Sequence, residues 1–285
     1  MIEVEGLHHD YTGRGEYAVR DVSFTVGAGE IFGLLGPSGA GKTTVQNLMT
    51  GLLSLQQGDI RYDGVRVDRL GRKFFNRVGV SFEQPNLYAR LTGYENLYYF
   101  SRLFDVPTED PLALLEMVGL RDDAHKMAGQ YSRGMRQRLV FVRSLVNNPE
   151  ILFLDEPTGG LDPNTAAGVK EIINQRKQRG RTILLTTHNM FLADELCDRV
   201  AFVDEGEMVA LDTPRNLKLQ WAKNAVRVEH VADGGEEISE VLRLDDPGER
   251  RRLQAVIEGG NVLTLHSQEA TLEQVFISMT GKVPK

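Results

Sequence analysis

Short apolar runs, bounded by polar residues, glycine or proline, recur along most of the chain. Three of them have the length and composition of strands that are buried on both faces: residues 31–35 (IFGLL), 151–154 (ILFL) and 182–187 (TILLTT). A glycine-rich turn and an amphipathic helix pattern follow the first run. The apolar positions of that helix are Val45, Leu48, Met49 and Leu52. Buried strands that alternate with helices predict an α/β fold around a parallel sheet.

A helical pattern replaces the strand pattern between about residue 85 and residue 149. Two apolar helices are expected within YENLYYFSRLFDV and DPLALLEMVGL. The apolar side chains near one face of the first are Tyr94, Leu97, Tyr98 and Phe104. A third helix is expected to begin after Ser132, a good N-cap, and to end before Pro149. Its shared apolar face consists of Leu139, Val142 and Val146. We therefore expect a helical subdomain here, with most of these stripes packed inside it.

The composition changes again near residue 220. Alternating patterns predict strands within residues 224–231, 236–244 and 261–267. Two helices are expected, one within residues 246–260 that Asp246 would cap and Gly259 would end, and one within 270–282. The chain is thus expected to have a main domain of residues 1–219 and a small C-terminal α+β appendage of residues 220–285.

The overall composition is that of a water-soluble globular protein. Of 285 residues, 41% are hydrophobic and 26% charged, and the net charge of −7 argues against non-specific nucleic-acid binding. No apolar run reaches the length of a membrane span and no signal peptide is visible at the N-terminus, so membrane work would need a partner. The single cysteine, Cys197, is expected to be a small packed residue rather than a nucleophile.

The turn after the first apolar run carries the strongest chemical motif. GPSGAGKT matches the G-x-x-x-x-G-K-[ST] pattern between a strand and a helix, which is the context a phosphate-binding loop requires. Its glycines let backbone N–H groups surround an anion, and the helix N-terminus adds a positive dipole end. The expected nucleotide contacts are Gly36, Pro37, Ser38, Gly39, Ala40, Gly41, Lys42, Thr43 and Thr44. Lys42 would reach the β- and γ-phosphates, and the Thr43 hydroxyl would bind Mg²⁺.

Polar residues follow the other two buried runs. Asp155 and Glu156 come directly after residues 151–154, and His188 follows residues 182–187. Ligands in α/β sheets gather at the carboxyl ends of strands, so these side chains are expected at the same edge as the phosphate loop. Asp155 would hold Mg²⁺, Glu156 would act as general base toward water, and His188 would donate to the γ-phosphate. The remaining histidines show no metal-ligand spacing and are expected to be structural.

With a further motif, YSRGMRQRL, residues 1 to about 219 closely resemble the nucleotide-binding domain of ATP-binding cassette (ABC) transporters. The resemblance is carried, in order, by HDY, GPSGAGKTT, FEQPNLYARLTGYENL, YSRGMRQRL, ILFLDEPTGGLD and TTH. It implies a P-loop NTPase (ABC ATPase) fold, ATP and Mg²⁺ as cofactors, and ATP hydrolysis. In this family the helical subdomain also receives a helix of the membrane subunit.

The resemblance assigns roles to matching positions. Tyr11 resembles the aromatic residue that stacks on adenine, although a tyrosine in an edge strand is the alternative. Gln84 matches the glutamine that contacts Mg²⁺ and the attacking water. Asp162, in GLDPNT, resembles the acid of a loop that crosses to the opposite subunit; Gly159 and Gly160 ahead of it depart from the commoner pattern.

In the family, a signature turn of the form L-S-G-G-Q binds the γ-phosphate of ATP on a second subunit. Here Ser132 and Gly134 remain, whereas Tyr131, Arg133 and Met135 replace the other three residues. Two interpretations of Arg133 stay open: a charge directed at phosphate or at the dimer interface, or part of a solvated basic face with Arg136 and Arg138.

One phosphate loop and one signature per chain imply a homodimer that closes around two MgATP. We therefore expect the ATPase subunit of a bacterial ABC exporter, cytoplasmic and peripheral at the inner face of the cell membrane, that works with integral-membrane subunits. ATLEQVFISMTG resembles the tail of such subunits in drug, antibiotic and polysaccharide exporters. The alternatives are a regulatory ATPase that transports nothing and a cytosolic clamp on DNA or ribosomes. No nucleic acid is expected as a partner.

Overall fold

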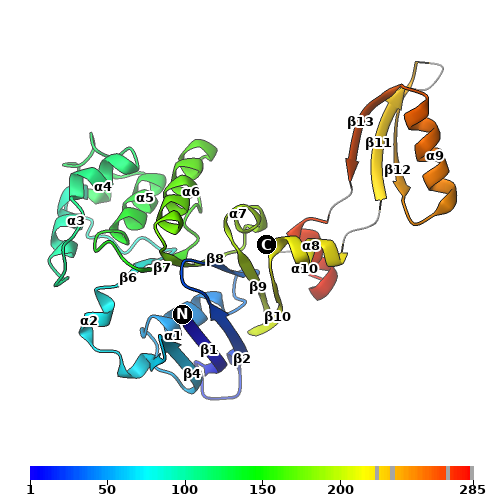
Figure 1. Ribbon diagram of the computed structural model, residues 1–285. Coiled ribbons are helices and arrows are strands. Elements are labelled where there is room, and N and C mark those ends of the chain that lie inside the picture. Colours follow the sequence, from blue (N-terminus) through cyan, green and yellow to red (C-terminus); the bar gives the residue numbers. More distant parts are fainter. Residues whose placement is uncertain (222–224, 232–234, 268–269, 283–285) are drawn as a thin grey trace. The chain divides into compact units, whose positions relative to one another are not determined.

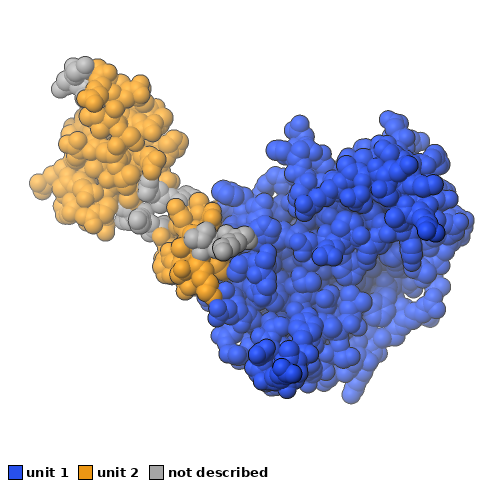
Figure 2. All heavy atoms as spheres, turned by 180° about the vertical axis from the view of Figure 1, so that it is seen from behind, with its two compact units in different colours: residues 1–213, 284–285 blue, residues 214–283 orange. Residues whose placement is uncertain are grey.

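The computed structural model describes residues 1–221, 225–231, 235–267 and 270–282. The chain divides into two compact units, Met1–Thr213 and a second that begins at Pro214, which Figure 2 shows in different colours. The boundary expected after residue 219 falls inside helix α8 (Pro214–Trp221), which belongs whole to the second unit. Among the described helices, none combines the length and hydropathy needed to cross a bilayer.

A six-stranded sheet forms the centre of the first unit. The strand order is β10-β9-β3-β8-β7-β6, and all neighbours are parallel except β10 and β9. The strands are β3 (Ile31–Leu35), β6 (Val78–Ser81), β7 (Ile151–Asp155), β8 (Thr182–Thr187), β9 (Arg199–Asp204) and β10 (Glu207–Asp212). Every residue of β3, β7 and β8 is buried, which explains their continuous rather than alternating apolar pattern. The α/β prediction is confirmed.

An antiparallel sheet of order β2-β1-β4-β5 lies on one side of the central sheet (Figure 1). Its strands are β1 (Ile2–Asp10), β2 (Tyr17–Val26), β4 (Gln57–Tyr62) and β5 (Val65–Arg66), followed by η1 (Val67–Arg69) and α2 (Arg72–Phe75). Helix α1 (Lys42–Met49) shares one hydrophobic core with both sheets through Val45, Leu48 and Met49. Leu52 was expected on the same face, but α1 ends before it and the residue is 60% exposed.

Helices cover the opposite side of the central sheet, where α3, α4 and α5 gather as a group in Figure 1. The remaining helices of this unit are α3 (Gly93–Ser101), α4 (Pro111–Met117), η2 (Ala128–Gln130), α5 (Arg133–Arg143), α6 (Pro163–Gln178) and α7 (Met190–Leu196). Two predictions for this region are wrong in detail. Phe104 lies beyond α3, although its ring still contacts Phe100. Helix α5 ends at Arg143, so Val146 lies outside it and Pro149 does not end it.

The second unit contains a three-stranded antiparallel sheet of order β12-β11-β13. Its elements are α8, β11 (Ala225–Val231), β12 (Glu237–Arg243), α9 (Pro247–Glu258), β13 (Val262–Ser267) and α10 (Leu272–Thr280). Leu253 of α9 packs with Val226, Val228 and Leu242 of the sheet in a small core. Asp246 caps α9 and Gly259 is its C-cap, as predicted. Asn224, at the start of the first expected strand, lies outside the described residues.

Candidate functional site

The predicted phosphate-binding residues lie in the loop between β3 and α1 and in the first turn of α1. They are Gly36, Pro37, Ser38, Gly39, Ala40, Gly41, Lys42, Thr43 and Thr44. Gly41 is the N-cap of α1 and has φ of 102°, and a Cβ there would lie 2.3 Å from the Ala18 carbonyl oxygen. Only glycine fits this position. No side chain caps the N-terminus of α1, so its first N–H groups are available to an anion.

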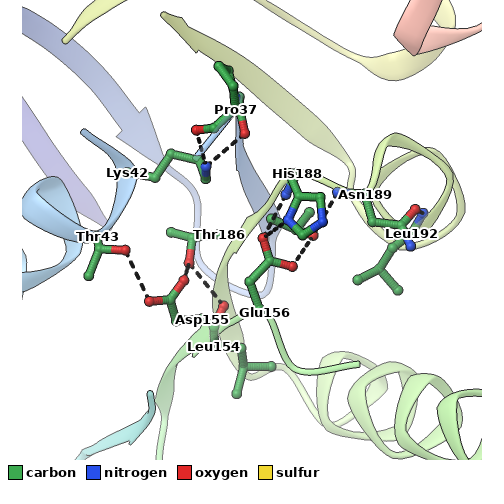
Figure 3. Close-up of polar contacts among 12 residues, drawn as sticks. Pro37, Lys42, Thr43, Leu154, Asp155, Glu156, Thr186, His188, Asn189 and Leu192 are labelled. Atoms are coloured by element: carbon green, nitrogen blue, oxygen red, sulfur yellow. Dashed lines mark hydrogen bonds and ion pairs between the residues drawn. The ribbon is translucent and has the colours of Figure 1, made fainter. Parts of the chain in front are cut away.

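The Lys42 ammonium is held inside the loop (Figure 3). Its Nζ donates hydrogen bonds to the carbonyl oxygens of Gly36 at 2.7 Å and Pro37 at 2.8 Å. Burial lowers the pKa of Lys42, and the carboxylates of Glu156, Asp155 and Glu83 oppose this effect. The loop therefore contains a poorly hydrated positive charge, which suits an anionic ligand.

Asp155 connects the acidic strand end to the phosphate loop. Its Oδ2 accepts a hydrogen bond from the Thr43 hydroxyl at 3.1 Å, and its Oδ1 accepts one from the Thr186 hydroxyl on β8. Burial raises the pKa of Asp155, while these two hydrogen bonds lower it. A carboxylate and a hydroxyl from separate elements thus meet at one place, as the sequence predicts.

Glu156 points away from Asp155 and toward His188, as Figure 3 shows. Its Oε1 accepts hydrogen bonds from the His188 backbone N–H at 2.8 Å and lies 2.6 Å from His188 Nδ1. Its Oε2 accepts a hydrogen bond from the Thr187 hydroxyl at 2.8 Å. The side chain of Glu156 is 10% exposed and that of His188 is 48% exposed. The carboxylate is therefore fixed in orientation, with an accessible imidazole beside it.

A cavity of about 630 Å³ opens over Glu156 and His188. Its lining also includes Gln84, Arg133 and Gln137. Gln84 follows β6, so it reaches the same sheet edge as the residues that follow β7 and β8. The backbone after it is held by the buried Arg143 of α5, which donates a hydrogen bond to the Asn86 carbonyl oxygen at 2.8 Å.

Tyr11 lies next to the phosphate loop and is 60% exposed. Its hydroxyl is 3.1 Å from the Thr44 hydroxyl, and its ring makes an edge contact with His9. The alternative of an edge-strand tyrosine does not hold, because Tyr11 comes after β1, and β1 is paired on both sides. An exposed aromatic ring beside the loop is suited to stacking against a planar base.

The signature turn, residues 131–135, caps and begins α5. The Ser132 hydroxyl accepts a hydrogen bond from the Met135 N–H at 3.2 Å, which confirms it as the N-cap. The basic-face interpretation is wrong for Arg136 and Arg138, because both are half-buried and donate hydrogen bonds to the carbonyl oxygens of Tyr131 and Val118.

Arg133 behaves differently from these two arginines. It is exposed, and both Arg133 and Gly160 line the cavity over Glu156. Near it, Gly134 lies beside Leu161, so the signature turn is close to the loop that follows Glu156.

Asp162 is the N-cap of α6. Its side chain accepts hydrogen bonds from the Thr165 N–H at 3.1 Å and the Thr165 hydroxyl at 2.6 Å, and these contacts lower its pKa. Within the chain Asp162 therefore has a structural role, and it remains exposed.

Two contributors were missed from the sequence. Thr186 and Thr187 are fully buried and connect β8 to both carboxylates. The sequence contains a signal for this role, because two residues with hydroxyl groups end an apolar strand directly before His188. The buried Cys197, by contrast, packs as predicted, and burial raises the pKa of its thiol far above the usual range.

The donor set also fits Mg²⁺. This ion takes oxygen ligands and is usually held by one or two carboxylates together with substrate phosphates. Asp155 and Thr43 supply such oxygens beside a phosphate loop. The described residues contain no group of three or more His, Cys, Asp and Glu that could form an all-protein metal cage.

Comparison with protein families matches residues 19–159 to the model described as "ABC transporter". A fluoroquinolones export ATP-binding protein of Mycobacterium tuberculosis is 51% identical over 99% of this chain and 94% of its own. A Nod factor export ATP-binding protein I of Burkholderia thailandensis is 38% identical over 93% of this chain and 92% of its own.

Solved structures show the same fold. An ATP-binding subunit of an ABC transporter has a TM-score of 0.70 at 28% identity and covers 78% of this chain and 93% of its own. A dimeric ATP-binding cassette in a post-hydrolysis state, bound to ADP and Pi, has a TM-score of 0.68 at 26% identity and covers 75% of this chain and 98% of its own.

Proposed function

Because this chain belongs to the family of ABC transporter ATP-binding proteins, we propose that it is the ATPase subunit of a bacterial exporter with separate membrane-spanning subunits. The chain is an ATP-binding protein and an ATPase by this membership. Export is supported by the two curated relatives, which are export proteins by name and match over nearly their whole length. The chain would be located at the cytoplasmic face of the membrane, where ATP is available.

ATP binding would use the loop between β3 and α1. Lys42 and the free N–H groups of α1 face the phosphates, and Tyr11 stacks on the adenine. Asp155, Thr43 and Gln84 would hold Mg²⁺, which neutralises phosphate charge when bound. The Thr43–Asp155 hydrogen bond joins the start of α1 to the end of β7.

Hydrolysis would use the cavity over Glu156. The observation that carries this proposal is the fixed Glu156 carboxylate, which faces a cavity shared with Gln84 and His188. Glu156 takes a proton from the attacking water as the water oxygen bonds to the γ-phosphorus and the bond from that phosphorus to the β–γ bridging oxygen breaks, which releases ADP and phosphate. Gln84 orients the water, and His188 and Lys42 stabilise the phosphate charge. Thr187 keeps the carboxylate in this orientation.

A second copy of the chain would complete each site. Each chain has one phosphate loop and one signature turn, and the related cassette bound to ADP and Pi is dimeric. Ser132 and Gly134 of one copy would face the γ-phosphate on the other, and Asp162 would lie at the interface. ATP binding then closes the homodimer, and hydrolysis reopens it and moves the membrane subunits.

Transport is tested in inside-out membrane vesicles that contain the chain and its membrane subunits. A fluoroquinolone is the first probe, because one relative carries that name. We expect ATP-dependent uptake, lost in vesicles with Glu156→Gln. A membrane protein that co-purifies without ATP-dependent flux would favour a regulatory ATPase, and recovery of the chain on ribosomes or DNA instead of membranes would favour a cytosolic clamp.

A further inference from the structure

Arg133 makes a close contact with the loop that carries the general base. This loop, residues 156–161, is called the Glu156 loop below. A Cβ placed on Gly160 would lie 3.2 Å from Arg133 Nε and 3.4 Å from Cζ, so the guanidinium would have to shift by a few tenths of an ångström to admit a side chain there. Gly160 has φ of 70°, which also favours glycine. The arginine in the signature turn and the glycine in the Glu156 loop are therefore complementary.

The contact belongs to a larger face of α5. Gln137, one helical turn after Arg133, has Nε2 3.4 Å from the Glu156 carbonyl oxygen. Gly134 lies beside Leu161 of the same loop. The first turns of the signature helix thus lie along the Glu156 loop from its first residue to its last.

The charge of Arg133 is not used in an ion pair within the described part of the chain. No described residue forms a hydrogen bond or ion pair with its side chain, whereas Arg136 and Arg138 each donate to a backbone carbonyl. Its described contact is packing on Gly160, at the wall of the cavity that contains Glu156 and Gln84. Arg133 therefore lies against a loop of its own chain.

We propose that Arg133 is a positioning residue that holds the Glu156 loop of its own chain against the signature helix and thereby sets the orientation of Glu156. The inference rests on the proposed ATPase mechanism. In the dimer, the same helix start would present Ser132 to the partner's nucleotide and Arg133 to its own catalytic loop. Docking of the partner at Ser132 would thus be transmitted to Glu156 through one helical turn.

The kinetic test compares Arg133→Ala with the unmodified chain. Alanine removes the contact without the added flexibility of glycine. We expect kcat to fall by about tenfold, since a small misplacement of a reacting group is enough for such a loss, while the KM for ATP stays within about twofold. Arg133→Lys keeps the charge but not the planar group, so its kcat should also remain below that of the unmodified chain. A raised KM with unchanged kcat, unchanged kinetics, or full recovery by lysine would each overturn the proposal.

A thermodynamic cycle tests the contact without using activity. Gly160→Ala is strained by its φ in any background, but only in the presence of Arg133 does the new methyl group also meet a guanidinium. We expect Gly160→Ala to lower the urea midpoint more in the Arg133 chain than in Arg133→Ala. Gly180→Ala is the control, because Gly180 has φ of 77° and no atom within 4 Å of a Cβ; its effect should be the same in both backgrounds. Additive effects of Arg133→Ala and Gly160→Ala would overturn the contact.

The two tests also separate this inference from the proposed function. If the unmodified chain hydrolyses no ATP, the proposed function fails, but the cycle still measures whether Arg133 and Gly160 interact. If ATP is hydrolysed but the effects of Arg133→Ala and Gly160→Ala on stability are additive, the positioning role of Arg133 is contradicted and the proposed function is not.

Discussion

Glu156 has a left-handed backbone conformation, with φ of 46°, at the end of a fully buried strand. For a residue with a side chain this costs roughly 1–2 kcal/mol. Here it turns the carboxylate away from Asp155 and toward Thr187 and His188. Two adjacent acids are thereby given different surroundings, one facing the phosphate loop and one facing the cavity. The sequence predicts the two roles from position alone, but not the backbone turn that separates them.

Lys42 is the residue on which phosphate binding depends most directly. Lys42→Ala removes a buried ammonium that already faces the loop carbonyls. A hydrogen bond to a charged group is worth about 1.5–3 kcal/mol, so we expect the Kd for ATP to rise by roughly 10- to 100-fold. Isothermal titration calorimetry measures this, with the exposed Lys73→Ala as control. An ATP affinity equal to that of the unmodified chain would argue against the phosphate-loop assignment.

At the scale of elements, the site is built from the carboxyl ends of neighbouring strands. β3, β8, β7 and β6 are adjacent in that order, and they lead into the phosphate loop, His188, the two acids and Gln84. On the helical side, a largely buried ion pair joins α6 to the segment that precedes α4. Arg176 of α6 donates two hydrogen bonds to Glu109, at 2.5 and 3.0 Å, and its side chain is 3% exposed.

Glu109→Ala should therefore destabilise the first unit strongly, because it leaves the Arg176 charge buried without its partner. We expect the free energy of unfolding to fall by about 3 kcal/mol. Glu116→Ala, which breaks an exposed pair with Arg121, should change it by less than about 1 kcal/mol. Urea unfolding is best followed by circular dichroism, since the one tryptophan, Trp221, lies in the second unit. Equal effects of the two substitutions would show that the Arg176 pair is not buried in solution.

Strands and motifs were predictable in this chain, and side-chain directions were not. Burial on both faces gives β3 and β7 an apolar pattern that cannot be mistaken for exposed structure. Helix ends were less certain, because Leu52 and Val146 continue a helical spacing after the backbone has turned. The side chain of Arg133 lies against Gly160, which is far from it in sequence and has no side chain of its own. Such a contact requires the tertiary structure.

At the scale of the whole molecule, the number of motifs predicts the assembly. One phosphate loop and one signature turn cannot complete a site that needs each from a different chain, whereas two chains complete two sites. The second unit has its own small core and sheet. The matches to export proteins include it, whereas the solved cassettes cover 75–78% of the chain.

The central claim is that Glu156 drives hydrolysis in an ATP-closed homodimer, and the most direct measurement is made on Glu156→Gln. Phosphate release and the molar mass in solution are measured in the same MgATP sample. We predict that release falls by ~10²–10⁴-fold, the usual contribution of a general base, while ATP is still bound and a species of twice the monomer mass accumulates. Glu116→Gln, on the exposed surface of α4, should behave like the unmodified chain. Phosphate release near the unmodified rate, or a chain that stays monomeric with ATP bound, would contradict the account.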